Sequence, residues 1–101
     1  MVIDEVQTGL GRTGSWWGID LHGVNPDVLT TGKPLGNGHP MAVVVTSKDM
    51  ASVLSPALVD TFRISPFQEV IGNTILDVIL QEKLVDNAKK TGQFITDYVN
   101  T

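Results

Sequence analysis

Two glycine-rich loops follow short apolar runs in the first half of this sequence, and this order constrains the fold most. Residues 2–3 come before a loop at 7–15 that has three glycines, and residues 28–31 come before a loop at 32–40 that has three more. Short apolar or β-branched runs bounded by glycine and proline are typical of buried strands. The pattern therefore predicts two strands, and we expect the polar residues that follow each strand to lie at its carboxyl end.

The second half of the chain changes from strands to helices. We expect another buried strand at 41–46 and a short helix at 48–54. A longer helix is predicted after Ser65, because Pro66 and Gln68 complete the pattern of an N-cap, a first-turn proline and a capping box. Strands and glycine loops followed by helices predict an α/β fold. The apolar positions with helical spacing form two groups, namely Phe67, Val70, Ile71, Ile75, Val78 and Ile79, and then Val85, Ala88, Ile95 and Val99.

The composition argues against several classes of protein. Apolar residues make up 42% of the 101 residues and charged residues 18%, as in globular proteins. The net charge is −4 and the seven basic residues are scattered, whereas nucleic-acid binding needs a clustered basic face. No apolar run reaches the roughly 20 residues of a membrane span. Cysteine is absent and His22 and His39 lack metal-ligand spacing, so no metal site is expected.

The first residues indicate a piece of a longer protein. Residues 2–3 resemble the tail of a buried strand, yet only Met1 precedes them, and strands usually run about 5–6 residues. We therefore expect a truncated chain. A short N-terminal edge strand is the alternative.

Asp4 and Lys33 are the candidates for chemistry, because each follows a predicted strand. Ligands of open α/β sheets bind beyond the carboxyl ends of strands, so we expect both side chains to line one crevice. Pyridoxal phosphate chemistry needs an amine to form a Schiff base and a carboxylate to hold the pyridine nitrogen protonated. From position alone, a solvated acid and a solvent-exposed lysine are the alternatives. A nucleoside-triphosphate loop does not fit, because there the lysine follows the glycines.

The motifs around these two residues resemble those of a known family. The segments DEVQTGLGRTG at 4–14 and PDVLTTGKPLGNGHP at 26–40 are similar to motifs of the class III, fold-type I, pyridoxal-phosphate-dependent aminotransferases. The GNGHP ending looks closest to the alanine–glyoxylate aminotransferase 2-like branch, which also holds phospholyases. The resemblance covers nearly the whole chain. It implies an incomplete α/β large domain, with 1–62 in the cofactor-binding part and 63–101 as a helical segment leading toward the C-terminal small domain.

The resemblance also implies roles for single residues. Asp4 would pair with the pyridine nitrogen of pyridoxal phosphate, and Gln7 would lie near the 3′-oxygen of its ring. Lys33 would bind the cofactor and move a proton between it and the substrate α-carbon. Thr61 would reach the cofactor phosphate of the neighbouring subunit. The family segment N-T-F-G-G-x-P reads DTFRISP here, so an Arg-Ile pair at 63–64 replaces two glycines, and its arginine is an alternative phosphate ligand.

The activity implied by the resemblance is transamination. An amino acid would give its nitrogen to a keto or aldehyde acid such as glyoxylate or pyruvate. A phospholyase acting on a phosphorylated amine, and a non-catalytic remnant of such an enzyme, are the alternatives. The family builds its site from distant segments and is usually homodimeric, so we expect this chain to be inactive alone. The family fits a mitochondrial or cytosolic location.

Overall fold

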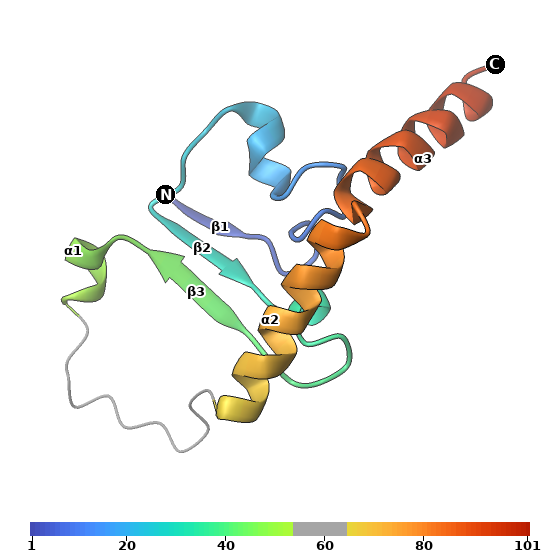
Figure 1. Cartoon of the computed structure of the whole chain (residues 1–101). Coiled ribbons are helices and arrows are strands. Elements are labelled where there is room, and N and C mark those ends of the chain that lie inside the picture. The colour runs from blue at the N-terminus through green and yellow to red at the C-terminus, as the bar shows by residue number, and fades with distance from the viewer. Residues whose placement is uncertain (54–64) are drawn as a thin grey trace.

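The computed structural model describes residues 1–53 and 65–101 (Figure 1). A small sheet and several short helical turns come first, and two long helices follow, as the pattern of the sequence predicts. In chain order the elements are β1 (Val2–Asp4), η1 (Gly18–His22), β2 (Val28–Thr31), η2 (Lys33–Leu35), β3 (Val43–Thr46), α1 (Lys48–Ala51), α2 (Pro66–Gln81) and α3 (Leu84–Val99).

The three strands form one mixed sheet in the order β1-β2-β3. β1 pairs in parallel with β2, and Asp4 lies opposite Thr30 in the register. β3 runs antiparallel to β2 and places Val43 opposite Thr31. Because β1 and β2 are parallel, their carboxyl ends meet at one edge of the sheet, and the two glycine loops start there.

The expectation of a buried strand at 41–46 is wrong in length and in burial. The strand begins at Val43, because β2 ends at its partner Thr31 and leaves the two preceding residues without a ladder. Val44 and Val45 are 64% and 51% exposed, since β3 lies at the edge of the described sheet. Val2 in β1, the opposite edge strand, is likewise exposed.

The helical predictions differ in how well they hold. The helix expected at 48–54 ends as a regular helix at Ala51. The predicted capping box is present, since Gln68 N donates to Ser65 Oγ at 3.3 Å and Ser65 N donates to Gln68 Oε1 at 2.8 Å. Gln68 Nε2 also donates to the carbonyl oxygen of Pro40 at 3.1 Å, which ties the start of α2 to the second glycine loop.

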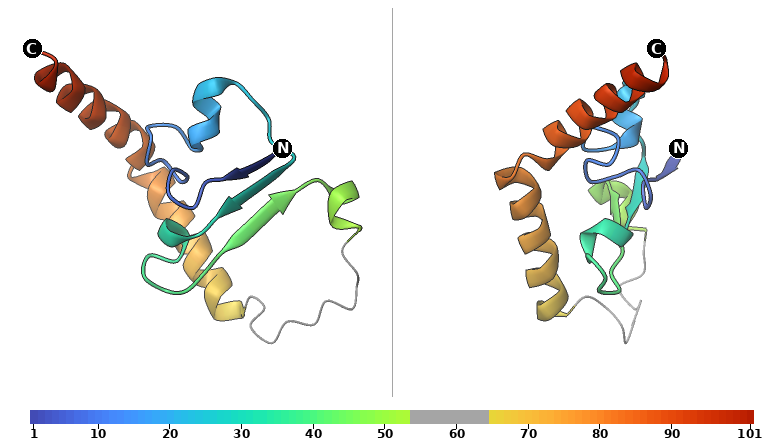
Figure 2. Two further views of the ribbon diagram at one scale, coloured as in Figure 1. Left: turned by 180° about the vertical axis from the view of Figure 1, so that it is seen from behind. Right: turned by 90° about the vertical axis from the view of Figure 1, so that its right-hand side faces the viewer.

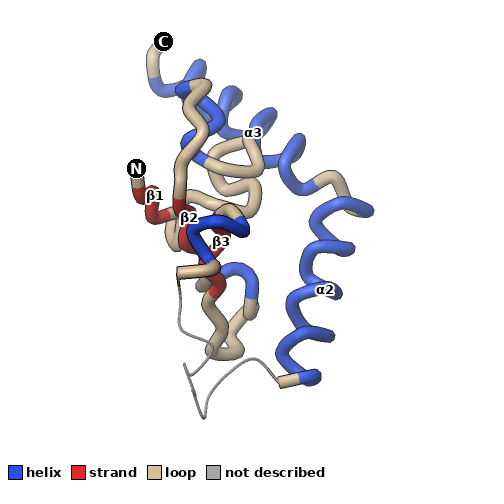
Figure 3. Tube along the Cα trace, turned by 90° about the vertical axis from the view of Figure 1, so that its left-hand side faces the viewer, coloured by secondary structure: helices blue, strands red, loops and turns tan. Residues whose placement is uncertain are grey.

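α2 lies beside one face of the sheet, and α3 continues away from it (Figures 2 and 3). The buried core consists of Leu10, Leu35 and Ile79, which come from the first glycine loop, from η2 and from α2. Gly72 of α2 is buried on the side of the helix that faces this core, and a Cβ there would lie in ordinary contact distance, 3.8 Å, of Leu35. The core therefore fixes both loops at the carboxyl edge of the sheet against one helix.

Candidate functional site

The turn after β1 and the neighbouring strand β2 hold the carboxylate of Asp4. Its Oδ1 accepts hydrogen bonds from the backbone N–H of Val6 and from the hydroxyl of Thr30, both at 3.0 Å. These two hydrogen bonds, the Val6 bond first, lower the pKa of Asp4 below its ordinary value, and the positive charge of Lys33 lowers it further. Asp4 is therefore ionised near neutral pH and can only accept hydrogen bonds.

Lys33 lies at the start of η2, two residues after the end of β2. The segment at 32–40, expected to be irregular, thus begins with one 3-10 turn. Lys33 Nζ donates to Gln7 Oε1 at 2.8 Å, so a side chain of the second glycine loop meets one of the first. Within residues 1–53 and 65–101, the amine of Lys33 is hydrogen-bonded to this neutral amide, and no carboxylate forms an ion pair with Lys33.

The backbone under Lys33 is fixed by packing and by a tight turn. Leu35 is 7% exposed and belongs to the core, and its N–H donates to Gly32 O at 2.7 Å. Gly36 allows the following turn, because a Cβ at this position would lie only 1.9 Å from the carbonyl oxygen of His39. The backbone of the lysine is therefore held on both sides, and its amine is hydrogen-bonded to Gln7.

Glu5 is a buried residue that the sequence marks only as a second acid at a strand end. It is 1% exposed, and its Oε1 accepts from the N–H of Ile19 at 2.7 Å while its Oε2 accepts from Gly18 at 3.0 Å and from the Thr8 hydroxyl. Burial raises the pKa of Glu5, but these hydrogen bonds outweigh burial and the net pKa is lowered. No local motif in the sequence indicates that Glu5 is buried and hydrogen-bonded, because two of its donors lie more than ten residues away in the chain.

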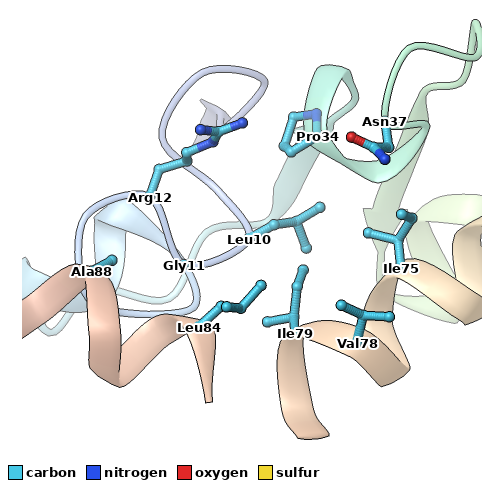
Figure 4. Close-up of a pocket in the computed structure, with 10 residues that line it drawn as sticks. All are labelled: Leu10, Gly11, Arg12, Pro34, Asn37, Ile75, Val78, Ile79, Leu84 and Ala88. Carbon is cyan, nitrogen blue, oxygen red and sulfur yellow. The ribbon is translucent and has the colours of Figure 1, made fainter. Parts of the chain in front are cut away.

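Two hollows in the described surface lie near these residues, and Asp4 lines one of them. One of about 340 Å³ opens beside Asp4 and is lined also by Thr8, Thr13 and His22. Another, of about 430 Å³, lies between the first glycine loop and the two long helices (Figure 4). Figure 4 shows Arg12 and Pro34 at its rim above an apolar floor, and Asp4, Gln7 and Lys33 do not line it. We place the chemistry with Asp4, Gln7 and Lys33 and not with the hollow of Figure 4.

The sequence names further candidates besides Asp4, Gln7 and Lys33. Thr61 and the arginine at 63 lie outside the described residues, so their predicted contacts with the cofactor phosphate are not tested. His39 packs edge-on against Phe67, with ring centroids 5.6 Å apart. No group of three or more metal-ligating side chains occurs in the part of the chain that the structure describes.

Comparison with known proteins decides the family. The family Aminotransferase class-III matches residues 1–101. This chain belongs to it. The predicted resemblance is thereby confirmed at the level of the family, and the small mixed sheet with helices is consistent with part of its α/β domain.

Curated relatives and solved structures agree with this membership. The chain is 42% identical to human mitochondrial alanine–glyoxylate aminotransferase 2 and 39% identical to an Arabidopsis thaliana homologue, and covers 93% and 95% of its own length in these matches. It spans about a fifth of these relatives, namely 19% and 20%. An S-selective transaminase from Arthrobacter superposes with a TM-score of 0.90 at 36% identity, over 98% of this chain and 22% of that one.

Pyridoxal phosphate is the cofactor of the family, and the residues present fit it. The ornithine aminotransferase from Toxoplasma gondii, with a TM-score of 0.91 at 36% identity, over 97% of this chain and 24% of that one, has been crystallised with partial occupancy of this cofactor at its active site. In this chain, an ionised carboxylate that only accepts hydrogen bonds suits a protonated pyridine nitrogen. An amine that is hydrogen-bonded to a neutral amide suits attachment to an aldehyde carbon.

Proposed function

We propose that this chain supplies the lysine and the carboxylate that hold pyridoxal phosphate in a class III transaminase. The supporting observation is the cluster at the carboxyl ends of two parallel strands, where Lys33 Nζ contacts Gln7 at 2.8 Å and its charge lowers the pKa of Asp4. The two loops that carry these residues are far apart in sequence, and the fold brings them together.

Each residue has its own role in this proposal. Asp4, with its ionised carboxylate, would hold the protonated pyridine nitrogen. Lys33 would hold the aldehyde carbon and would carry a proton to and from the substrate α-carbon. Gln7 lies next to Lys33, and its amide would face the ring's 3′-oxygen. When bound, the cofactor supplies a conjugated ring that accepts electrons from the substrate.

The proposed substrates are an amino acid and a keto or aldehyde acid such as glyoxylate or pyruvate. The relatives from human and Arabidopsis that carry alanine and glyoxylate in their names support this pairing.

Both relatives are named as mitochondrial proteins, and we propose a mitochondrial location for this protein too. No helix in the described parts of the chain meets the length and apolarity needed to cross a membrane. A homodimer, the division at 62/63 and the role of Thr61 stay predictions.

Binding of pyridoxal phosphate tests the proposed role of Lys33. We expect titration of the purified chain to give a visible absorbance band that is absent in Lys33→Ala. Lys48→Ala is the matched control, because Lys48 is a lysine that lies in α1, away from the cluster, and we expect it to keep the band. An equal band in Lys33→Ala would show that the cofactor reacts with other lysines and would reject the proposal.

Products separate the proposed activity from its alternatives. With alanine and glyoxylate, a transaminase gives pyruvate and glycine, whereas a phospholyase releases inorganic phosphate from phosphoethanolamine. The test uses a chimera in which residues 1–101 replace the matching segment of the Arthrobacter transaminase, since the two superpose with a TM-score of 0.90. We expect amino transfer that Lys33→Ala abolishes. A folded chimera without activity would favour the non-catalytic remnant.

A further inference from the structure

Glu5 stands out as a buried charged group that the proposed chemistry does not use. With 1% of its surface exposed, it is the largest fully buried side chain of the described residues. Both carboxylate oxygens are satisfied, by the hydroxyl of Thr8 and by the backbone N–H groups of Gly18 and Ile19. A buried carboxylate is unfavourable unless donors surround it, so this arrangement requires several groups to be placed together.

The donors come from the turn at 5–9 and from the start of η1, and together they fix the position of that turn. Gly9 N donates to Glu5 O at 2.9 Å and the Thr8 hydroxyl donates to the Glu5 carboxylate, which closes the turn at 5–9. Glu5 N in turn donates to Thr30 O at 2.8 Å and joins the turn to β2. The bonds from Gly18 and Ile19 anchor the same carboxylate to the start of η1.

Gln7 is at the centre of the turn that Glu5 closes. Its side chain is exposed, and the contact recorded for it among the described residues is the hydrogen bond that its Oε1 accepts from Lys33 Nζ. An exposed glutamine has many rotamers, so a fixed backbone beneath it reduces the freedom that this contact must remove.

We propose that Glu5 is a positioning residue that holds the turn at 5–9 so that Gln7 meets Lys33. This inference rests on the proposed function, in which Lys33 binds the cofactor. Glu5 touches neither Lys33 nor Asp4 through a hydrogen bond, and acts through Thr8 and the backbone of the turn.

The first experiment measures the side chain of Gln7 without any cofactor. Amide NMR relaxation reports its mobility, and Gln81, an exposed glutamine late in α2, is the internal reference. In Glu5→Gln we expect the mobility of the Gln7 amide to rise to that of Gln81. Asp20→Asn is the matched control, because Asp20 is an exposed acid that accepts from Trp17 N at the same helical turn. We expect it to leave Gln7 unchanged.

The second experiment measures the reactivity of Lys33 by pyridoxal phosphate labelling, borohydride reduction and peptide mass spectrometry. We expect Glu5→Gln to lower the rate at Lys33 by about three- to tenfold, in the lower part of the range found for coupled neighbours, with the other lysines unchanged. In a Gln7→Ala background, Glu5→Gln should have no further effect on Lys33. A purely structural role predicts an equal loss in both backgrounds.

The outcomes separate this inference from the proposed function. A Gln7 amide that stays as rigid in Glu5→Gln as in the parent, or an undiminished effect in the Gln7→Ala background, would overturn the positioning role. If Glu5→Gln does not fold by circular dichroism, Thr8→Val removes a single hydrogen bond and is judged by the same two readouts. If the parent chain shows no preferential labelling of Lys33, the proposed function fails, while the mobility of Gln7 still decides the inference.

Discussion

The pKa of Asp4 is lowered more by its hydrogen-bond donors than by the charge of Lys33. The backbone N–H of Val6 and the hydroxyl of Thr30 donate to the same oxygen, and the lysine adds a smaller electrostatic effect. The carboxylate is therefore prepared for a cationic pyridine nitrogen before any cofactor binds. Lys33, by contrast, has a neutral partner and keeps its amine available.

Removing the Thr30 hydroxyl tests this order of effects. We expect Thr30→Val to raise the pKa of Asp4 toward its ordinary value of 3.8, because one donor to the charged form is lost. Lys33→Met should raise it less. NMR titration of the Asp4 carboxyl carbon measures both shifts, and Thr74→Val, whose hydroxyl bonds to Val70 O within α2, should leave it unchanged. A larger shift in Lys33→Met would contradict the order.

We expect Glu5 to make the stability of the folded chain depend on pH in the acid range. Its pKa is lowered from the ordinary value of 4.5, so its contribution to stability is complete above that pH and is lost as the pH falls through the lower folded-state pKa. The nearby charge of Asp4 opposes ionisation, and the three donors favour it.

Urea unfolding at pH 6 and pH 3 measures this dependence. At pH 6 we expect Glu5→Gln to lower the free energy of unfolding by about 1.5–3 kcal/mol, the value of a hydrogen bond to a charged group. The difference between mutant and parent should shrink at pH 3, although other carboxylates also titrate there. A difference that is equal at both pH values would mean that the charge of Glu5 does not contribute.

At the scale of elements, the turn η2 connects the reactive lysine to the core. Lys33 and Leu35 are two residues apart, and Leu35 packs with Leu10 and Ile79. The same leucine therefore joins η2 to the first glycine loop and to α2. Packing of Leu35 thus fixes the backbone of the turn from which the Lys33 side chain extends.

Truncating Leu35 should loosen this connection. We expect Leu35→Ala to lower the free energy of unfolding by about 2–5 kcal/mol, because it leaves a cavity in the core. Leu80→Ala is the control, since Leu80 is 59% exposed and surface changes usually stay within about 0.5 kcal/mol. Chemical denaturation of both variants compares them, and equal losses would show that η2 does not depend on the core.

The sequence predicts the elements whose signals are local and misses those that depend on distant partners. The start of α2 follows from Ser65, Pro66 and Gln68, and the end of β2 from the glycine after it. The length of β3 does not follow from local signals, because the strand begins at Val43, where pairing with Thr31 of β2 begins. The burial of Glu5 is also invisible, since its donors at Gly18 and Ile19 are brought to it by the fold.

In the candidate site, too, the sequence predicts which residues take part and misses the contacts that depend on the fold. The pattern of strand ends and the family motifs identify Asp4, Gln7 and Lys33 as candidates, and the parallel pairing of β1 with β2 accounts for their meeting at one edge. The hydrogen bond between Lys33 and Gln7 could not be predicted, because it depends on the rotamers of two long side chains. The role of Thr61 stays a prediction.

At the scale of the whole molecule, the described chain is extended and exposes apolar surface. Its radius of gyration is 16.0 Å, whereas about 13 Å is typical for 100 residues. α3 projects from the body, and Phe94 and Tyr98 near its end are 71% and 76% exposed (Figure 1). β3 is an edge of the described sheet that carries an exposed Val44, and such edges favour association with other strands.

We therefore expect the purified chain to self-associate as its concentration rises. Val44→Lys should weaken this association, because a charged side chain on an edge strand disfavours pairing with a second edge. Val53→Lys is the control, since Val53 is 82% exposed but lies beyond the strands. Sedimentation velocity measures the effect, and equal weakening by both variants would point to charge alone.

The central claim is that Asp4 and Lys33 serve a single cofactor molecule. A crystal structure of the chain bound to pyridoxal phosphate and reduced with borohydride tests it most directly. We expect a covalent bond between Lys33 Nζ and the former aldehyde carbon, with the Asp4 carboxylate about 2.7–2.9 Å from the pyridine nitrogen. Attachment to another lysine, or a pyridine nitrogen directed away from Asp4, would contradict the claim.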